Sequence, residues 1–115
     1  MATFVLMTKL SHSTLSDPRG RKRTGAEWKR KVEKACPDVK WLAHYALLGP
    51  YDFMDIYEAP DQETAFRVSL MSREEGALSA ESWPAMSYEQ FLGNAATVER
   101  VESNAGGKKH KKKKR

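Results

Sequence analysis

The chain has 115 residues, which is the usual length of a single domain. No segment reaches the run of about 20 apolar residues that a membrane-spanning helix requires, and the N-terminus lacks the features of a signal peptide. The single cysteine, Cys36, excludes an intramolecular disulfide and fits a reducing compartment, so we expect a cytoplasmic protein.

The net charge of +5 comes from one end of the chain. Seven of the 20 Lys and Arg residues lie in 108–115, which leaves 13 cations against 15 acidic residues elsewhere. We therefore predict a folded domain at 1–93 and a disordered, lysine-rich tail at 94–115. Such a tail should attract nucleic acid or another polyanion by counterion release. The residues expected to make this contact are Lys108, Lys109, Lys111, Lys112, Lys113, Lys114 and Arg115.

The first third of the chain predicts a strand followed by a helix. Residues 3–10 are rich in β-branched and apolar side chains and are short enough for a strand. The polar segment Ser11–Asp17 then forms a turn. A helix begins at Pro18 or at the capping-box sequence 24–27, and it ends before Pro37. Its buried stripe is expected to consist of Trp28, Val32 and Ala35.

The middle of the chain predicts two strands and a second helix. The strands cover 39–48 and 51–58, and the helix covers 62–75. Asp61 is a suitable N-cap, and Gly76 is a C-terminal signal. The apolar stripe of this helix is expected to consist of Ala65, Phe66, Ser69 and Leu70.

A fourth strand is predicted at 78–86, with Pro84 placing it at a sheet edge, and a short capped helical turn follows at 87–92. The element order is β-α-β-β-α-β. With right-handed crossovers, this order gives a ferredoxin-like α+β sandwich, in which a four-stranded antiparallel sheet has two helices on one face.

The turn at 48–51 connects the second and third strands. A two-residue turn would use a positive φ at Gly49, and a four-residue loop is also possible. Both loops have the same parity, so both place the same side chains together. In the two-residue register, His44 lies directly opposite Asp55.

This parity separates two faces of the hairpin. The nearly all-apolar face is expected to pack on the helices, and it carries Trp41, Ala43, Tyr45, Leu47, Met54 and Ile56. The other face is mixed, and it carries Leu42, His44, Ala46, Leu48, Phe53, Asp55 and Tyr57. Because this mixed face would otherwise be exposed to water, we expect a homodimer that packs sheet against sheet.

The mixed face supplies the candidate site. We predict that a small molecule binds near the dimer interface at His44, Phe53, Asp55 and Tyr57. A carboxylate beside an imidazole fixes the tautomer of the ring and raises its basicity, so an alternative is a cofactor-independent oxygenase or isomerase with His44 as the base. A third possibility is a polyanion-associated protein that acts through its tail. We expect neither a cofactor nor a metal.

The sequence Gly49-Pro50-Tyr51-Asp52, followed by Ile56 and by 58–61 (Glu-Ala-Pro-Asp), resembles the motif of the GYD domain family. The resemblance extends over residues 3–92. It implies a small ferredoxin-like protein of the dimeric α/β-barrel type, and it implies no particular reaction. The family positions correspond to Gly49, Tyr51 and Asp52. We expect Asp52 to brace the turn through backbone N–H groups and Tyr51 to pack across the strands.

Overall fold

The computed structural model describes the backbone of residues 1–16 and 18–110, with the side chains of these ranges except residues 15, 18–21, 24 and 104–110. The chain divides into two compact units, Met1–Ala85 and Met86–Arg115, which are described separately.

The first unit contains one four-stranded sheet. Its strands are β1 (Ala2–Leu10), β2 (Lys40–Ala46), β3 (Phe53–Ala59) and β4 (Ala77–Ala85). They lie in the order β2-β3-β1-β4, and each strand is antiparallel to its neighbours. The predicted strands therefore all form, with ends that differ by one or two residues.

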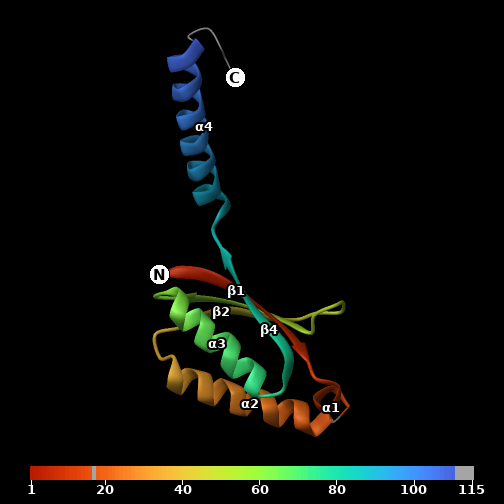
Figure 1. The fold of residues 1–115 in the computed structure, drawn as a ribbon. Coiled ribbons are helices and arrows are strands. Elements are labelled where there is room, and N and C mark those ends of the chain that lie inside the picture. The colour runs from red at the N-terminus through yellow and green to blue at the C-terminus, as the bar shows by residue number, and fades with distance from the viewer. Residues whose placement is uncertain (17, 111–115) are drawn as a thin grey trace. The chain divides into compact units, whose positions relative to one another are not determined.

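Helices α2 (Pro18–Ala35) and α3 (Gln62–Glu74) lie together on one face of this sheet (Figure 1). This arrangement confirms the predicted ferredoxin-like α+β fold. A one-turn helix, α1 (His12–Leu15), occupies part of the segment that was predicted as a turn. Ser11 caps it, because the backbone N–H of Thr14 donates to Ser11 Oγ at 3.3 Å.

The ends of α3 follow from local chemistry. Asp61 is the N-cap, and its Oδ1 accepts a 2.8 Å hydrogen bond from the backbone N–H of Thr64. After the helix, Gly76 adopts a φ of 113°, a conformation that favours glycine. Both predicted signals are thus confirmed.

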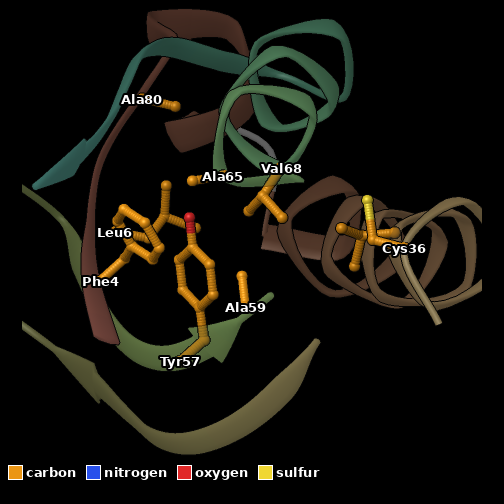
Figure 2. Close-up of a cluster of buried hydrophobic side chains, with 9 residues drawn as sticks. Phe4, Leu6, Cys36, Tyr57, Ala59, Ala65, Val68 and Ala80 are labelled. Atoms are coloured by element: carbon orange, nitrogen blue, oxygen red, sulfur yellow. The ribbon is translucent and has the colours of Figure 1, made fainter. Parts of the chain in front are cut away.

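The core lies between the sheet and the helices (Figure 2). Figure 2 shows the Tyr57 ring among the side chains of Phe4, Leu6 and Ala59. Tyr57 is fully buried, and its hydroxyl pairs with Ser82 Oγ at 2.6 Å. The other buried hydrophobic side chains of this cluster are Val32, Cys36, Ala65, Val68 and Ala80.

The predicted helix stripes are partly wrong. Val32 in α2 and Cys36, which directly follows the helix, are buried, whereas Ala35 is exposed. Cys36 follows Val32 by four residues, which is the spacing of one helix face. In α3, Ala65 and Val68 are buried together with Thr64 and Ser72, whereas Phe66 and Leu70 are exposed.

Trp41 packs on the helix side as predicted, but the other paired residues of the two predicted hairpin faces lie on the sides of the sheet opposite to those expected. Tyr57 is buried under the helices, so Ile56 and Met54 must lie on the opposite, open face. A β-bulge at Leu42 adds one residue to β2, because Trp41 pairs with Tyr57 but Ala43 pairs with Ile56. The bulge brings Trp41 to the helix side together with His44.

The loop between β2 and β3 is wider than a two-residue turn. The last paired residues are Ala46 and Phe53, and the backbone N–H of Leu47 donates to the carbonyl of Asp52 at 2.8 Å. Four residues, 48–51, therefore form the loop, which was the second alternative. Gly49 does not adopt a positive φ, so the requirement for glycine expected there is wrong.

In the second unit, α4 (Tyr88–His110) begins as the predicted capped turn and then continues. The backbone N–H of Gln90 donates to Ser87 Oγ at 3.1 Å, and the backbone N–H of Ser87 donates to Gln90 Oε1 at 3.2 Å, which is a capping box. The helix continues through 94–110, and 95–102 contain no Gly or Pro to interrupt it. Residues 111–115 lie outside the described residues.

Candidate ligand-binding site

A cavity of about 460 Å³ lies in the first unit, between the helix-facing side of β2 and β3 and the helices α2 and α3. Trp28 from α2, Trp41 from β2 and Phe53 from β3 contribute aromatic walls. Ser72 and Glu75 border it from α3. Residues far apart in the sequence thus form a mostly apolar hollow with a few polar groups, as is common for small-molecule sites.

His44 and Asp55 form a hydrogen-bonded pair in the wall of this cavity. They are directly opposite in the β2–β3 ladder, as predicted, and His44 Nδ1 lies 2.5 Å from Asp55 Oδ1. The Asp55 side chain is 7% exposed, whereas that of His44 is 60% exposed. The pair therefore has a buried carboxylate behind an imidazole that a ligand can reach.

Burial raises the pKa of Asp55, because the charged carboxylate loses hydration inside the protein. The charge of His44, its hydrogen bond and the charge of Lys29 act in the opposite direction. A buried carboxylate that accepts from Nδ1–H holds the imidazole in one tautomer. Nε2 is then the ring nitrogen left for a ligand.

Aromatic contacts fix the other walls. The His44 ring stacks on Phe53 with centroids 5.4 Å apart and an interplanar angle of 20°. Trp28 and Trp41 meet edge to face at 5.3 Å. The indole Nε1–H of Trp28 donates to Ser72 Oγ at 2.8 Å, which ties α2 to α3. The cavity is therefore lined by side chains with fixed orientations.

The structure separates Tyr57 from the other three predicted ligand residues. His44, Phe53 and Asp55 line the cavity, but Tyr57 lies in the core and does not. Burial raises the pKa of Tyr57 to about 12, against the effect of its hydrogen bond to Ser82. Because it points into the core, Tyr57 serves packing and does not present a proton donor to the cavity.

The family-motif residues fasten the β2–β3 loop. Asp52 Oδ2 accepts a 2.7 Å hydrogen bond from the backbone N–H of Leu10. The Tyr51 ring meets Trp83 edge to face at 5.9 Å, and its hydroxyl donates to Glu81 Oε1 at 3.4 Å. Asp52 thus accepts a backbone N–H as expected, although the donor belongs to β1 and not to the turn. A Cβ added at Gly49 would meet no atom within 4 Å, so no close neighbour requires a glycine at this position.

Several cavity residues could not be assigned to a site from the sequence. Trp28 was expected only in a helix stripe, and Trp41 only in the core. The bulge at Leu42 places Trp41 on the same side of the sheet as His44. A bulge has no reliable sequence pattern. Among the described side chains, no group of three His, Cys, Asp or Glu lies close enough to hold a metal ion.

The structure describes the backbone of only two of the predicted polyanion-binding residues. Lys108 and Lys109 lie in the last turn of α4, and Lys111, Lys112, Lys113, Lys114 and Arg115 lie outside the described residues. None of the helices that the structure describes, α4 included, is long and apolar enough to span a bilayer.

The fold and the cavity define a small α+β protein with ferredoxin-like topology. Residues 4–95 match the GYD domain family, and the chain belongs to this family, as the motif indicated. The glutamine synthetase and cystathionine beta-lyase binding protein of Thermus thermophilus is 30% identical over an alignment of 82 residues, and the alignment covers 68% of this chain and 81% of that protein. No solved structure matches the chain.

Proposed function

We propose that this GYD domain protein binds a small, partly aromatic molecule in the cavity between α2 and the β2–β3 hairpin. The observation that carries the proposal is an aromatic cavity of about 460 Å³ with the buried carboxylate of Asp55 in its wall. Small-molecule sites combine apolar walls with a few oriented polar groups in this way. The ligand was expected on the dimer face of the sheet, but the cavity lies on the helix side and needs no second copy.

Filling the cavity tests this function. Gly25 lies in the cavity wall, and a Cβ added there meets no atom within 4 Å, so Gly25→Leu should narrow the cavity without a clash at the Cβ. Gly93→Leu is the matched control, because Gly93 is also helical and unobstructed but lies in the other unit. Both variants should be compared with the wild type against a set of aromatic fragments.

Binding can be followed by tryptophan fluorescence in a Trp83→Phe background, since the remaining Trp28 and Trp41 both line the cavity. We expect fragments that quench the wild-type signal to lose binding in Gly25→Leu and to keep it in Gly93→Leu. If no fragment binds, or if Gly25→Leu binds as well as the wild type, the cavity is not a ligand site.

We propose a second function, the binding of another protein through the open face of the sheet. The relative from Thermus thermophilus is named for binding two enzymes, which favours this role. In the first unit, no described helix covers this face, and Tyr45 and Trp83 are 55% and 43% exposed on it. Met54 and Ile56 lie beside them. Aromatic and apolar side chains of this kind form the centres of protein interfaces.

This surface can be tested with purified glutamine synthetase and cystathionine beta-lyase from the source organism. We expect Tyr45→Glu to abolish binding, while Phe66→Glu, on the exposed side of α3, should leave it unchanged. Equal binding by both variants would exclude the open face. The sequence places the homodimer on the mixed face with His44, which lies on the helix side, so a dimer that packs sheet against sheet would use the open face instead. Sedimentation of the wild type and Tyr45→Glu distinguishes a second copy from a different protein.

Two further roles rest on single features. The His44–Asp55 pair has the geometry of a general base, so cofactor-independent proton transfer stays the enzymatic alternative. The lysine-rich residues 108–115 support binding of nucleic acid or another polyanion. A cytoplasmic location agrees with the single buried cysteine, Cys36.

A further inference from the structure

The cavity contains only a few groups that can choose among ligands. Its aromatic walls bind flat rings of many kinds, so they give little selectivity by themselves. Glu75 Oε2 is already paired with Lys31 Nζ at 2.9 Å, and Ser72 accepts from Trp28. Thr8, Thr14 and Lys29 also line the cavity, and Thr14 Oγ1 already donates to the carbonyl of Gly76 at 3.4 Å. The His44–Asp55 pair differs from these groups because an exposed ring is held by a buried partner, so we assign the main selectivity to this pair.

The bond from His44 to Asp55 determines what the imidazole offers. Asp55 Oδ1 accepts from Nδ1, and a neutral imidazole protonated at Nδ1 has a lone pair at Nε2. Nε2 is thus a hydrogen-bond acceptor. The stack on Phe53 fixes the plane of the ring, so the direction of this acceptor is fixed as well.

Charged ligands fit the cavity less well. A cationic ligand would meet Lys29, which lines the cavity and already acts on Asp55. An anionic ligand would be attracted by Lys29 but would lie near the buried carboxylate of Asp55, which would repel it. A neutral molecule that has a flat ring and one hydrogen-bond donor avoids both costs.

We propose that the cavity is selective for neutral aromatic compounds with a phenolic or enolic hydroxyl, which donates its hydrogen bond to Nε2 of His44 while the ring packs against Trp28, Trp41 and Phe53. This inference rests on the proposed small-molecule function and names its ligand class. Asp55 is a positioning residue, because it acts on the ligand only through His44.

The test uses 2-naphthol, which has the hydroxyl, and 2-methoxynaphthalene, in which a methyl group replaces the donated hydrogen. Both titrations are carried out in the same buffer, at one pH and one salt concentration. The full-length wild type should bind 2-naphthol about twofold to tenfold more tightly than 2-methoxynaphthalene, which is the range for one net hydrogen bond.

The variant His44→Phe keeps a flat ring on Phe53 and removes Nε2, so the preference for 2-naphthol should disappear. Tyr45→Phe, next to it in β2 but exposed on the open face, should keep the preference. If both compounds bind equally to the wild type, or if the preference survives in His44→Phe, the hydroxyl class is wrong but the cavity remains a ligand site. If neither compound binds, the proposed function itself is contradicted.

One measurement needs no variant. A long-range proton–nitrogen NMR spectrum of the wild type reports the tautomer of each of the three histidines. We expect the proton of His44 on Nδ1, and 2-naphthol should shift the Nε2 resonance of His44 but not that of His12. A proton on Nε2 of His44 in the free protein would overturn the inference.

Discussion

The side-chain Oδ2 of Asp52 accepts a hydrogen bond of 2.7 Å from the backbone N–H of Leu10, at the end of β1. The backbone N–H of Asp52 in turn donates to the carbonyl of Thr8 at 2.8 Å, and Lys9 Nζ donates to the carbonyl of Pro50 at 3.1 Å. The loop that carries the family motif is therefore bound to a strand more than 40 positions earlier in the chain.

Replacing Asp52 should destabilise the protein. In Asp52→Ala the N–H of Leu10 loses its acceptor in a partly buried place, which should lower the free energy of unfolding by about 1–3 kcal/mol. Urea denaturation measures the change. Asp38→Ala removes an exposed carboxylate and should have little effect. Equal stability of the two variants would show that the Asp52 bond contributes nothing.

The hydroxyl of Tyr57 should contribute to stability and not to binding. Tyr57→Phe removes its 2.6 Å bond to Ser82, while Ser82 keeps its 2.7 Å bond to Ser69. We expect a loss of about 1 kcal/mol in the free energy of unfolding, with unchanged affinity for aromatic fragments. Tyr45→Phe alters an exposed tyrosine and should not change stability. A weakened affinity of Tyr57→Phe for the fragments would contradict this prediction and would indicate that Tyr57 contacts the ligand.

The pH dependence of stability should report the buried carboxylate of Asp55. Burial raises its pKa above 3.8, so the folded state binds more protons than the unfolded state between these two pKa values. The contribution of Asp55 to the stability of the wild type therefore falls as the pH rises from 3.8 through the raised pKa. Asp55→Asn cannot titrate, so its stability relative to the wild type should increase across this interval.

Urea denaturation from about pH 3 to about pH 6 measures this difference. Asp61→Asn is the control with the opposite sign, because hydrogen bonds from the side chain and the backbone of Thr64 lower the pKa of Asp61. Here the wild type gains stability as the pH rises toward 3.8, so the relative stability of Asp61→Asn should decrease. A flat difference for Asp55→Asn would contradict the raised pKa.

Local chemistry made most of this fold predictable. The caps at Asp61 and Gly76 and the strand patterns specify the elements, and the parity of the hairpin specifies the pairing of His44 with Asp55. These signals depend on neighbours within a few residues. The order β-α-β-β-α-β then leaves few compact topologies.

The side of the sheet on which the site lies could not be obtained in the same way. Parity groups Phe53, Asp55 and Tyr57 together, but it does not say which group meets the helices. The pattern predicts that the more apolar group forms the core. Tyr57 of the other group is nevertheless buried, and Ser82 satisfies its hydroxyl. The bulge at Leu42 depends on tertiary packing of Trp41, so the sequence pattern does not contain it.

Two glycines should respond to alanine in opposite ways. Gly25 lies inside α2, and a Cβ there meets no atom within 4 Å, so Gly25→Ala should raise the free energy of unfolding by about 0.5–1 kcal/mol. Gly76 has a φ of 113°, where a Cβ is strained, so Gly76→Ala should lower stability by about 1 kcal/mol or more. Thermal unfolding ranks the two variants against the wild type. A stabilised Gly76→Ala would contradict the conformation at the end of α3.

The lysine-rich end should bind polyanions in proportion to its charge. Six Lys and one Arg lie in 108–115, so the slope of log affinity against log salt for duplex DNA should approach about −6 if all seven contact phosphates. Fluorescence anisotropy with a labelled duplex measures this slope. Deleting 106–115 should abolish binding, while the thermal stability of Met1–Ala85, which contains the whole sheet, should be unchanged. Replacing the six lysines by Gln keeps the chain length and should also abolish binding. If the deletion variant still binds DNA, the interaction does not depend on the tail.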